Sequence, residues 1–286
     1  MKASSKLPYS LLGITLSCLA FSSYAAKYDN CYAAGKVPAE RQIYKSSAVL
    51  MLDETVVFDV TQHDHIRKQA ERLLAYGNEL RIFTFSAYRD GRYTLPVLEV
   101  RLAMQLEESV RYTMRKDSVR EFDTCQQASM NNAKQQLSMV LTNYFGQSSS
   151  DLANSDILGT LKEIGESVFP ALRSKNTRLI LVSDMLENSG KMSFYGAGGV
   201  PRAIDSSAEL KMVDNLSLVS DFRGASVYVI GAGVAPIADK KSGSSYRSQA
   251  IMLPLKKFWT QYFEKSNAKI VEFGQPLLLT PIGGDK

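Results

Sequence analysis

Residues 48–55 read Ala-Val-Leu-Met-Leu-Asp-Glu-Thr, and this stretch decides the fold class that we expect. A short apolar run that ends in an acid is typical of a strand buried on both faces, as the strands of parallel sheets are. Comparable runs occur at 179–182, which ends in Ser183-Asp184, and at 227–230, which ends in Gly231-Ala232-Gly233. The sequence therefore predicts at least three buried parallel strands.

Helical patterns separate these runs. Apolar residues recur at steps of three or four, the spacing of one helix face, in residues 62–77, 155–170, 206–222 and 253–266. Further strands are expected at 80–85, 93–102 and 269–273, the first two joined by the turn signal Arg89-Asp90-Gly91. This order predicts an α/β domain: a doubly wound, mostly parallel sheet with helices on both faces and one antiparallel edge strand.

The chain divides into three expected parts, the last of which contains an insertion. Residues 1–25 are predicted to be a signal peptide, 26–46 an irregular lead-in, and 47–286 a single α/β domain. About 105–146 form a polar segment without strand character, which we expect to be a helical insertion of one or two helices. A chain of this length favours one large core over two.

The start of the chain predicts export. Lys2 and Lys6 precede an apolar run over 11–21, and Ser23-Tyr24-Ala25 has the small residues that a signal peptidase reads. Cleavage after Ala25 would give a periplasmic or secreted protein. Two alternatives stay open: a lipid anchor on Cys18, and an uncleaved anchor. No later stretch is long and apolar enough to span a membrane.

Cysteine use and charge agree with this location. Removal of the leader leaves Cys31 and Cys125, an even number in an oxidising compartment, so we expect a disulfide between them; two free thiols are the alternative. The chain has a formal net charge of +5, and no basic run of the kind that nucleic-acid binders carry.

Polar residues gather where the predicted strands end. Ligands of such sheets bind beyond the carboxyl ends of the strands, where the strand order reverses, so Asp53, Thr55, Ser155 and Asp184 are expected to share one pocket. Two close carboxylates repel each other unless a cation lies between them. Carboxylates, hydroxyls and water are the oxygen ligands that suit Mg²⁺.

This arrangement resembles the von Willebrand factor A family over most of residues 47–274. The family binds a divalent cation through Asp-x-Ser-x-Ser after its first strand, a Thr before a helix and an Asp after a later strand. Asp53 and Thr55 match the first two positions, Ser155 corresponds to the Thr, and Asp184 to the late Asp. Val57 stands at the second Ser position and cannot coordinate a metal.

The resemblance implies a function without catalysis. In the family an acidic side chain of a partner protein completes the coordination of the cation. The chain would therefore be an interaction module and not an enzyme, dependent on Mg²⁺ or another divalent cation, with its partner bound at 147–156 and 186–199. The alternative is a metal-free scaffold subunit of an envelope or secretion-type assembly, in which Asp53 and Asp184 bond backbone amides or cap helices, and Ser155 is an ordinary helix N-cap.

Other interpretations rest on single features. Asp53-Glu54-Thr55 also resembles the start of aspartate-nucleophile phosphotransferases, with Ser183 as their second motif, but no acid follows the later strand at 227–230. His63 and His65 are the only histidines, and we expect them at a solvated helix start. The aromatic residues of 258–263 are expected to form the buried face of the last helix.

Overall fold

The computed structural model describes residues 31–38, 44–89, 92–150, 154–235 and 246–283. The predicted signal peptide, with Cys18, lies outside the described residues. Within these ranges, no helix combines the length and apolar character that crossing a membrane requires.

Six strands form one sheet in the order β3-β2-β1-β4-β5-β6. The strands are β1 (Ser46–Asp53), β2 (Asn78–Arg89), β3 (Arg92–Arg101), β4 (Thr177–Val182), β5 (Ala225–Ile230) and β6 (Ala268–Phe273). All neighbours are parallel except β2 and β3, which form an antiparallel pair at one edge. The predicted fold class is confirmed. Chain order reverses between β1 and β4, so the switch point of the sheet lies there.

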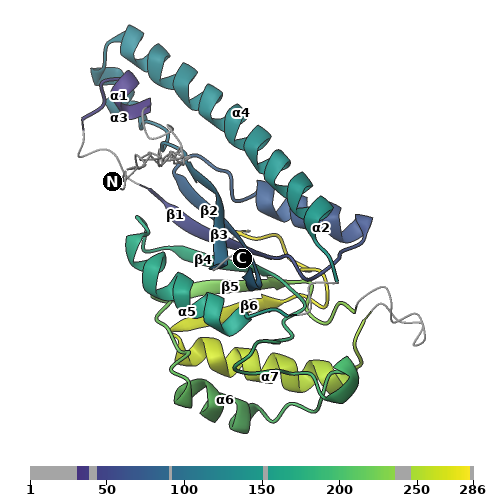
Figure 1. Cartoon of the computed structure of the whole chain (residues 1–286). Helices are drawn as coiled ribbons and strands as arrows, with labels where there is room; N and C mark the ends of the chain where they lie inside the picture. The colour runs from purple at the N-terminus through teal and green to yellow at the C-terminus, as the bar shows by residue number, and fades with distance from the viewer. Residues whose placement is uncertain (1–30, 39–43, 90–91, 151–153, 236–245, 284–286) are drawn as a thin grey trace, which may run out of the picture.

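Helices cover both faces of the sheet (Figure 1). The seven α-helices of the described residues are α1 (Cys31–Ala34), α2 (Val60–Glu71), α3 (Glu108–Thr113), α4 (Lys116–Gln147), α5 (Ile157–Ser167), α6 (Ser206–Asn215) and α7 (Gln249–Lys265). Alternate residues of β1 serve the two cores, as the period of two of a strand requires. Val49 and Met51 pack with α5, α6 and α7, whereas Leu50 and Leu52 pack with α2 and α4.

Two helix ends differ from the prediction. The helix expected over 206–222 ends at Asn215, because Ser217 adopts a positive φ of 52°. Leu218 and Phe222 lie beyond the helix but are still buried in the core. Their apolar side chains therefore made the helical pattern in the sequence look longer than the helix is. The helix expected over 62–77 ends at Glu71, and the chain turns into β2 through Gly77 at φ 86°.

A small lobe stands beyond the amino ends of the strands. Helix α4 has 32 residues, which gives a length of roughly 48 Å at 1.5 Å per residue. It is much longer than strand β4, which has six residues. The first turns of α4 therefore project past the sheet, where α1 and α3 pack against them around Phe122 and Tyr32 (Figure 1). Below, α1, α3 and these first turns of α4 are called the lobe.

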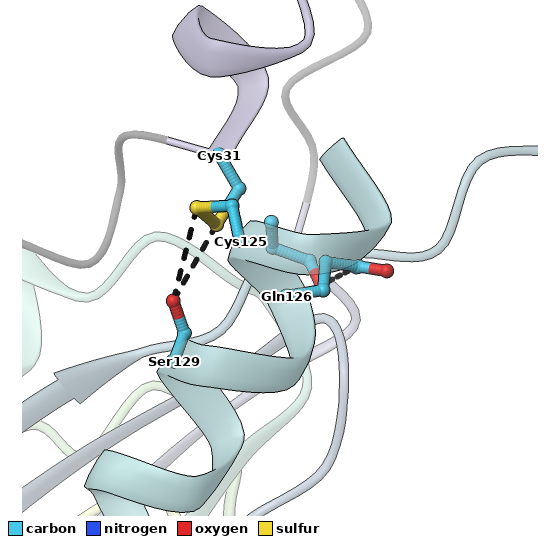
Figure 2. The surroundings of a disulfide bond; sticks show 5 residues. Cys31, Cys125, Gln126 and Ser129 are labelled. Carbon is cyan, nitrogen blue, oxygen red and sulfur yellow. Dashed lines mark hydrogen bonds between the residues drawn. A yellow bond between two sulfur atoms is a disulfide. The ribbon is translucent and has the colours of Figure 1, made fainter. Parts of the chain in front are cut away.

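The predicted disulfide fastens this lobe. Cys31 of α1 and Cys125 of α4 are bonded, with their Cα atoms 5.4 Å apart (Figure 2). One turn further along α4, Ser129 Oγ lies 3.4 Å from the Cys31 sulfur. Residues Cys31–Ala34 form a short helix, although the whole segment 26–46 was expected to be irregular. A disulfide of this kind suits an oxidising compartment.

The chain ends in a strap, residues 274–283, that returns across the face covered by α2. Leu278 and Ile282 are buried in the same core as α2 and α4. The Leu278 amide donates to His65 Nε2 at 3.2 Å, and the Ile282 amide donates to Gln69 Oε1 at 2.9 Å. The strap covers part of the sheet that α2 and α4 leave open.

Candidate functional site

The site is built around the carboxylate of Asp53, the last residue of β1, whose side chain is 0% exposed. Its Oδ1 accepts hydrogen bonds from the Thr55 amide at 3.0 Å and the Thr55 hydroxyl at 2.7 Å. Its Oδ2 accepts from the hydroxyls of Ser155 at 3.0 Å and Ser183 at 2.7 Å. Four donors occupy the roughly four acceptor positions that a carboxylate offers.

The sheet and one loop pairing bring these residues together. Strands β1 and β4 are parallel neighbours with Leu52 opposite Val182, so Asp53 and Ser183 follow at the same level. Ser155 is held in place by Asn188, because the amide of each donates to the carbonyl of the other at 2.9 Å. Two of the other predicted site residues, Thr55 and Ser155, therefore bond directly to Asp53, one on each carboxylate oxygen.

Ser155 does not cap the helix that follows it. The N-cap of α5 is Asp156, whose side chain accepts from the Gly159 amide at 2.8 Å. The alternative interpretation of Ser155 as an N-cap is therefore wrong, and its hydroxyl is free to bond Asp53.

Asp184, the fourth predicted residue, lies beside this cluster. Its side chain is 8% exposed, and its Oδ1 accepts from the Leu186 amide at 2.9 Å. The pKa of Asp184 is raised to about 7, chiefly by burial and then by the nearby charge of Asp53, and the Leu186 amide and Arg247 oppose the rise. Burial also raises the pKa of Asp53, against the four hydrogen bonds that lower it. The two acids thus share one low-dielectric environment.

Arg247 places a cation next to Asp184. The Gly233 amide donates to the Asp184 carbonyl at 3.0 Å, and the Arg247 amide donates to the Gly233 carbonyl at 2.9 Å. The guanidinium group acts on the pKa of Asp184 and is hydrogen-bonded to the Tyr195 side chain. Burial is the main cause of the raised pKa of Tyr195, followed by the charge of Asp184. Sequence reasoning missed Arg247, which belongs to no motif; Tyr195 lies in the segment 186–199 that was expected to bind a partner, but it had no role of its own there.

The carboxyl end of α4 also reaches the site. The hydroxyl of Tyr144, itself buried, donates to the backbone carbonyl of Asp53 at 2.8 Å. Nearby, the Ser149 amide donates to the Glu54 carbonyl at 3.0 Å. The helical insertion is therefore joined to the site at this end, as well as to the lobe at the other.

A further acid, Glu187, is buried near the site. It belongs to the loop after β4 and contacts the first turn of α5. It is 0% exposed, and its Oε2 accepts from the Leu158 amide at 2.9 Å. The pKa of Glu187 is raised to about 8, first by burial and then by the charge of Asp156. Glu187 lies in the segment 186–199 that was expected at the site, but no motif marked it as a buried acid.

The fit of a divalent cation can be tested on the donors that remain. Hydroxyl lone pairs of Thr55 and Ser155 and one carboxylate oxygen of Asp184 could face an ion, and Val57 supplies none. With water, this number of donors would suffice for Mg²⁺. The charges suit it less well, because the charge of Arg247 already acts on Asp184 and lowers its pKa. Within the described ranges, no group of three or more His, Cys, Asp or Glu could hold a metal. The cation stays a prediction, which titration tests.

The other single-feature interpretations have mixed outcomes. The aromatic residues of α7 do form its buried face, with Phe258, Trp259, Tyr262 and Phe263 in the core. The histidines lie in the first turns of α2 as expected, but both are half-buried and have partners, so full solvation is not borne out. The ring of His63 stacks on Phe145 with 3.9 Å between centroids, and His65 accepts from the strap.

The surface around the site carries exposed apolar side chains. Val60, in the first turn of α2, is 82% exposed, and Tyr246 is also exposed. Tyr246 lies against the first turns of α2, since Gln62 Nε2 donates to the Tyr246 hydroxyl at 3.3 Å. Val200 is exposed in the loop that follows Glu187. We call the surface formed by the loops at the carboxyl ends of β1, β4 and β5, including Val60, Val200 and Tyr246, the rim.

Comparison with known proteins gives remote structural similarities only. No protein-family model and no curated protein matches the chain. An aerotolerance-related membrane protein from Bacteroides fragilis NCTC 9343 is 12% identical, with a TM-score of 0.36 over 81% of this chain and 93% of that chain. The pilus adhesin SpaC from Lactobacillus rhamnosus GG is 11% identical, with a TM-score of 0.33 over 77% of this chain and 30% of the adhesin. The type V pili tip protein Mfa5 from Porphyromonas gingivalis is 11% identical, with a TM-score of 0.28 over 68% of this chain and 29% of that chain. At this level of similarity, function has to be argued from the site itself.

Proposed function

We propose that this chain is an exported protein-interaction module that binds a partner protein through the rim. The observation that carries the proposal is the set of hydrogen bonds that the Asp53 carboxylate accepts. One carboxylate fixes the loop after β1 through Thr55, the segment before α5 through Ser155, and the end of β4 through Ser183. Loops held in one arrangement before binding lose little conformational entropy when a partner docks, which favours affinity.

The side chains displayed on this fixed frame suit a protein partner. Val60 and Tyr246 are both exposed, Tyr246 contacts α2 through Gln62, and Arg247 follows Tyr246 in the chain. Tyrosine and arginine are enriched among residues that dominate interface energies. Ser155 and Tyr195, which belong to the two segments singled out in the sequence, lie at the same site.

The same geometry disfavours a phosphotransferase. A nucleophilic carboxylate must present an oxygen lone pair to the substrate. Asp53 is fully buried, and each of its oxygens already accepts two hydrogen bonds. Its role is therefore to position loops, and an attack on a phosphoryl group would first require those bonds to break.

Two versions of the proposal differ in their need for metal. In the first, a divalent cation held by Thr55, Ser155 and Asp184 helps to bind the partner. In the second, the chain is a metal-free scaffold within an envelope or secretion-type assembly. Arg247 beside Asp184 favours the second version.

A matched pair of double variants tests the rim. Val60→Asp with Tyr246→Ala alters the rim, and Met139→Asp with Tyr112→Ala makes the same changes at exposed positions of α4 and α3. An acid at the start of α2 suits the helix dipole, so the first variant should fold. In pull-downs from the native periplasm, the partner retained by wild type should be lost by the rim variant and kept by the control. The opposite pattern would refute the rim as the binding surface.

A further inference from the structure

We propose that Arg247 is the permanent counter-charge of the rim, and that it takes the position a divalent cation would otherwise hold beside Asp184. The inference deepens the proposed function, since it concerns the same rim, and it commits the chain to the metal-free version. It assigns a positioning role to a residue that no motif marks.

The first support is the place of Arg247 in the fold. The Gly233 amide donates to the Asp184 carbonyl, and the Arg247 amide donates to the Gly233 carbonyl. Gly233 thus joins the backbone of Arg247 to that of Asp184. A further bridge pairs the next residues outward, Val234 and Tyr246. The backbone at Arg247 is thus anchored to the turn after β5, and its side chain is half-buried. An arginine on an unanchored surface loop would have no such fixed position.

The second support is the unequal distribution of donors between the two acids. Asp53 has four hydrogen-bond donors and needs no further partner. For Asp184 the corresponding contact is the Leu186 amide. A buried carboxylate with few donors requires a neighbouring cation to stay ionised. Arg247 supplies this charge at every physiological pH, because the guanidinium group does not deprotonate.

The third support is the charge that a metal ion would add. Asp53 and Asp184 carry two negative charges at most, and Arg247 already brings one positive charge. A divalent ion would leave a net positive charge in a site whose main residues are buried. Val57, which stands where the related family has a second hydroxyl ligand, fits the same conclusion.

Arg247 also ties another segment to the rim. Its hydrogen bond to the Tyr195 side chain connects the turn after β5 with the loop that follows Glu187. Removal of Arg247 should therefore have two effects: an uncompensated acid pair, and a looser loop at the binding surface.

Thermal unfolding with and without metal tests the proposal. The fluorescence of Trp259, the single tryptophan, reports on the core. Wild type should show the same Tm in EDTA, in millimolar MgCl2 and in millimolar MnCl2. Arg247→Gln should melt at a lower temperature, and Mn²⁺ should raise its Tm by about 3 °C or more, where 1 kcal/mol corresponds to about 2–4 °C. Arg247→Lys, which keeps the charge, should stay insensitive to metal. Arg120→Gln, in an exposed ion pair of α4, is the control and should behave like wild type.

A double variant makes the test independent of general destabilisation. If Arg247 compensates Asp184, then Asp184→Asn should remove most of the Tm loss caused by Arg247→Gln. A wild-type Tm that rises with Mn²⁺ and loses this response in Asp184→Asn would show a metal site and overturn the inference. So would an Arg247→Gln variant that melts like wild type. Neither result would affect the rim as a binding surface, which the pull-down with the Val60 and Tyr246 changes tests separately.

Discussion

Replacing Glu187 with glutamine should make the stability of this protein less dependent on pH. Glu187 is fully buried, and its pKa is raised from 4.5 to about 8 by burial and then by the charge of Asp156. An acid with a higher pKa in the folded than in the unfolded state binds more protons when folded. The free energy of unfolding therefore falls as pH rises from about 4.5 to about 8, and Glu187 stabilises the fold only below this range.

The size of the effect follows from the pKa values. Each pH unit within the window changes the free energy of unfolding by about 1.4 kcal/mol. Over the whole window, the loss is on the order of 5 kcal/mol, a large part of the 5–15 kcal/mol typical of a domain. Glutamine has the size of the protonated acid and can still accept from the Leu158 amide. Its NH2 group adds a buried donor, which can cost about 1–3 kcal/mol at every pH.

The difference between variant and wild type isolates this effect. Asp184, with its pKa raised to about 7 chiefly by burial, titrates in both proteins, so its contribution cancels. Urea unfolding followed by Trp259 fluorescence at pH 5, 6, 7 and 8 gives the free energies. We expect the variant to gain about 1.4 kcal/mol relative to wild type for each pH unit. Parallel stability curves for the two proteins would refute the assignment of a raised pKa to Glu187.

Two further predictions concern the attachments of α4. Tyr144→Phe removes the hydrogen bond to the Asp53 carbonyl and should lower the free energy of unfolding by about 1–2 kcal/mol in urea; an unchanged midpoint would mean that this bond contributes nothing. Changing both Cys31 and Cys125 to serine opens a loop with a sequence separation of 94 and should cost up to about 4 kcal/mol, with proteolysis starting in the lobe. Equal protease resistance of the oxidised and the double-serine proteins would contradict this.

The sheet could be predicted from the sequence because its strands are buried on both faces. Ala48–Leu52 and Leu179–Val182 have no polar residue to interrupt them, and each is followed by an acid within two residues. In a parallel sheet these carboxyl ends must meet at one edge. The closeness of Asp53 to Asp184 thus followed from chain order and strand direction, whereas Ser155 ends no strand and was placed at this edge with the help of the family resemblance.

The rest of the site could not be predicted, for physical reasons that differ among residues. Tyr144 bonds Asp53 across 91 positions of the chain, and its place depends on how α4 crosses the sheet. Arg247 reaches Asp184 through a turn after β5 that carries no charge pattern. Helix α6 ends where Ser217 adopts a positive φ. A serine gives no indication of this conformation in the sequence, as a glycine would.

Both ends of the described chain lie on the side of the sheet away from the rim. Cys31 is fastened in the lobe, and Gly283 approaches the guanidinium of Arg178, which donates to Ser46 at the start of β1. An affinity tag or a surface linker joined next to Cys31 or next to Gly283 would thus lie on the side opposite the rim. If the chain is anchored through its amino end in the cell, the same layout would aim Val60 and Tyr246 outward, toward whatever approaches.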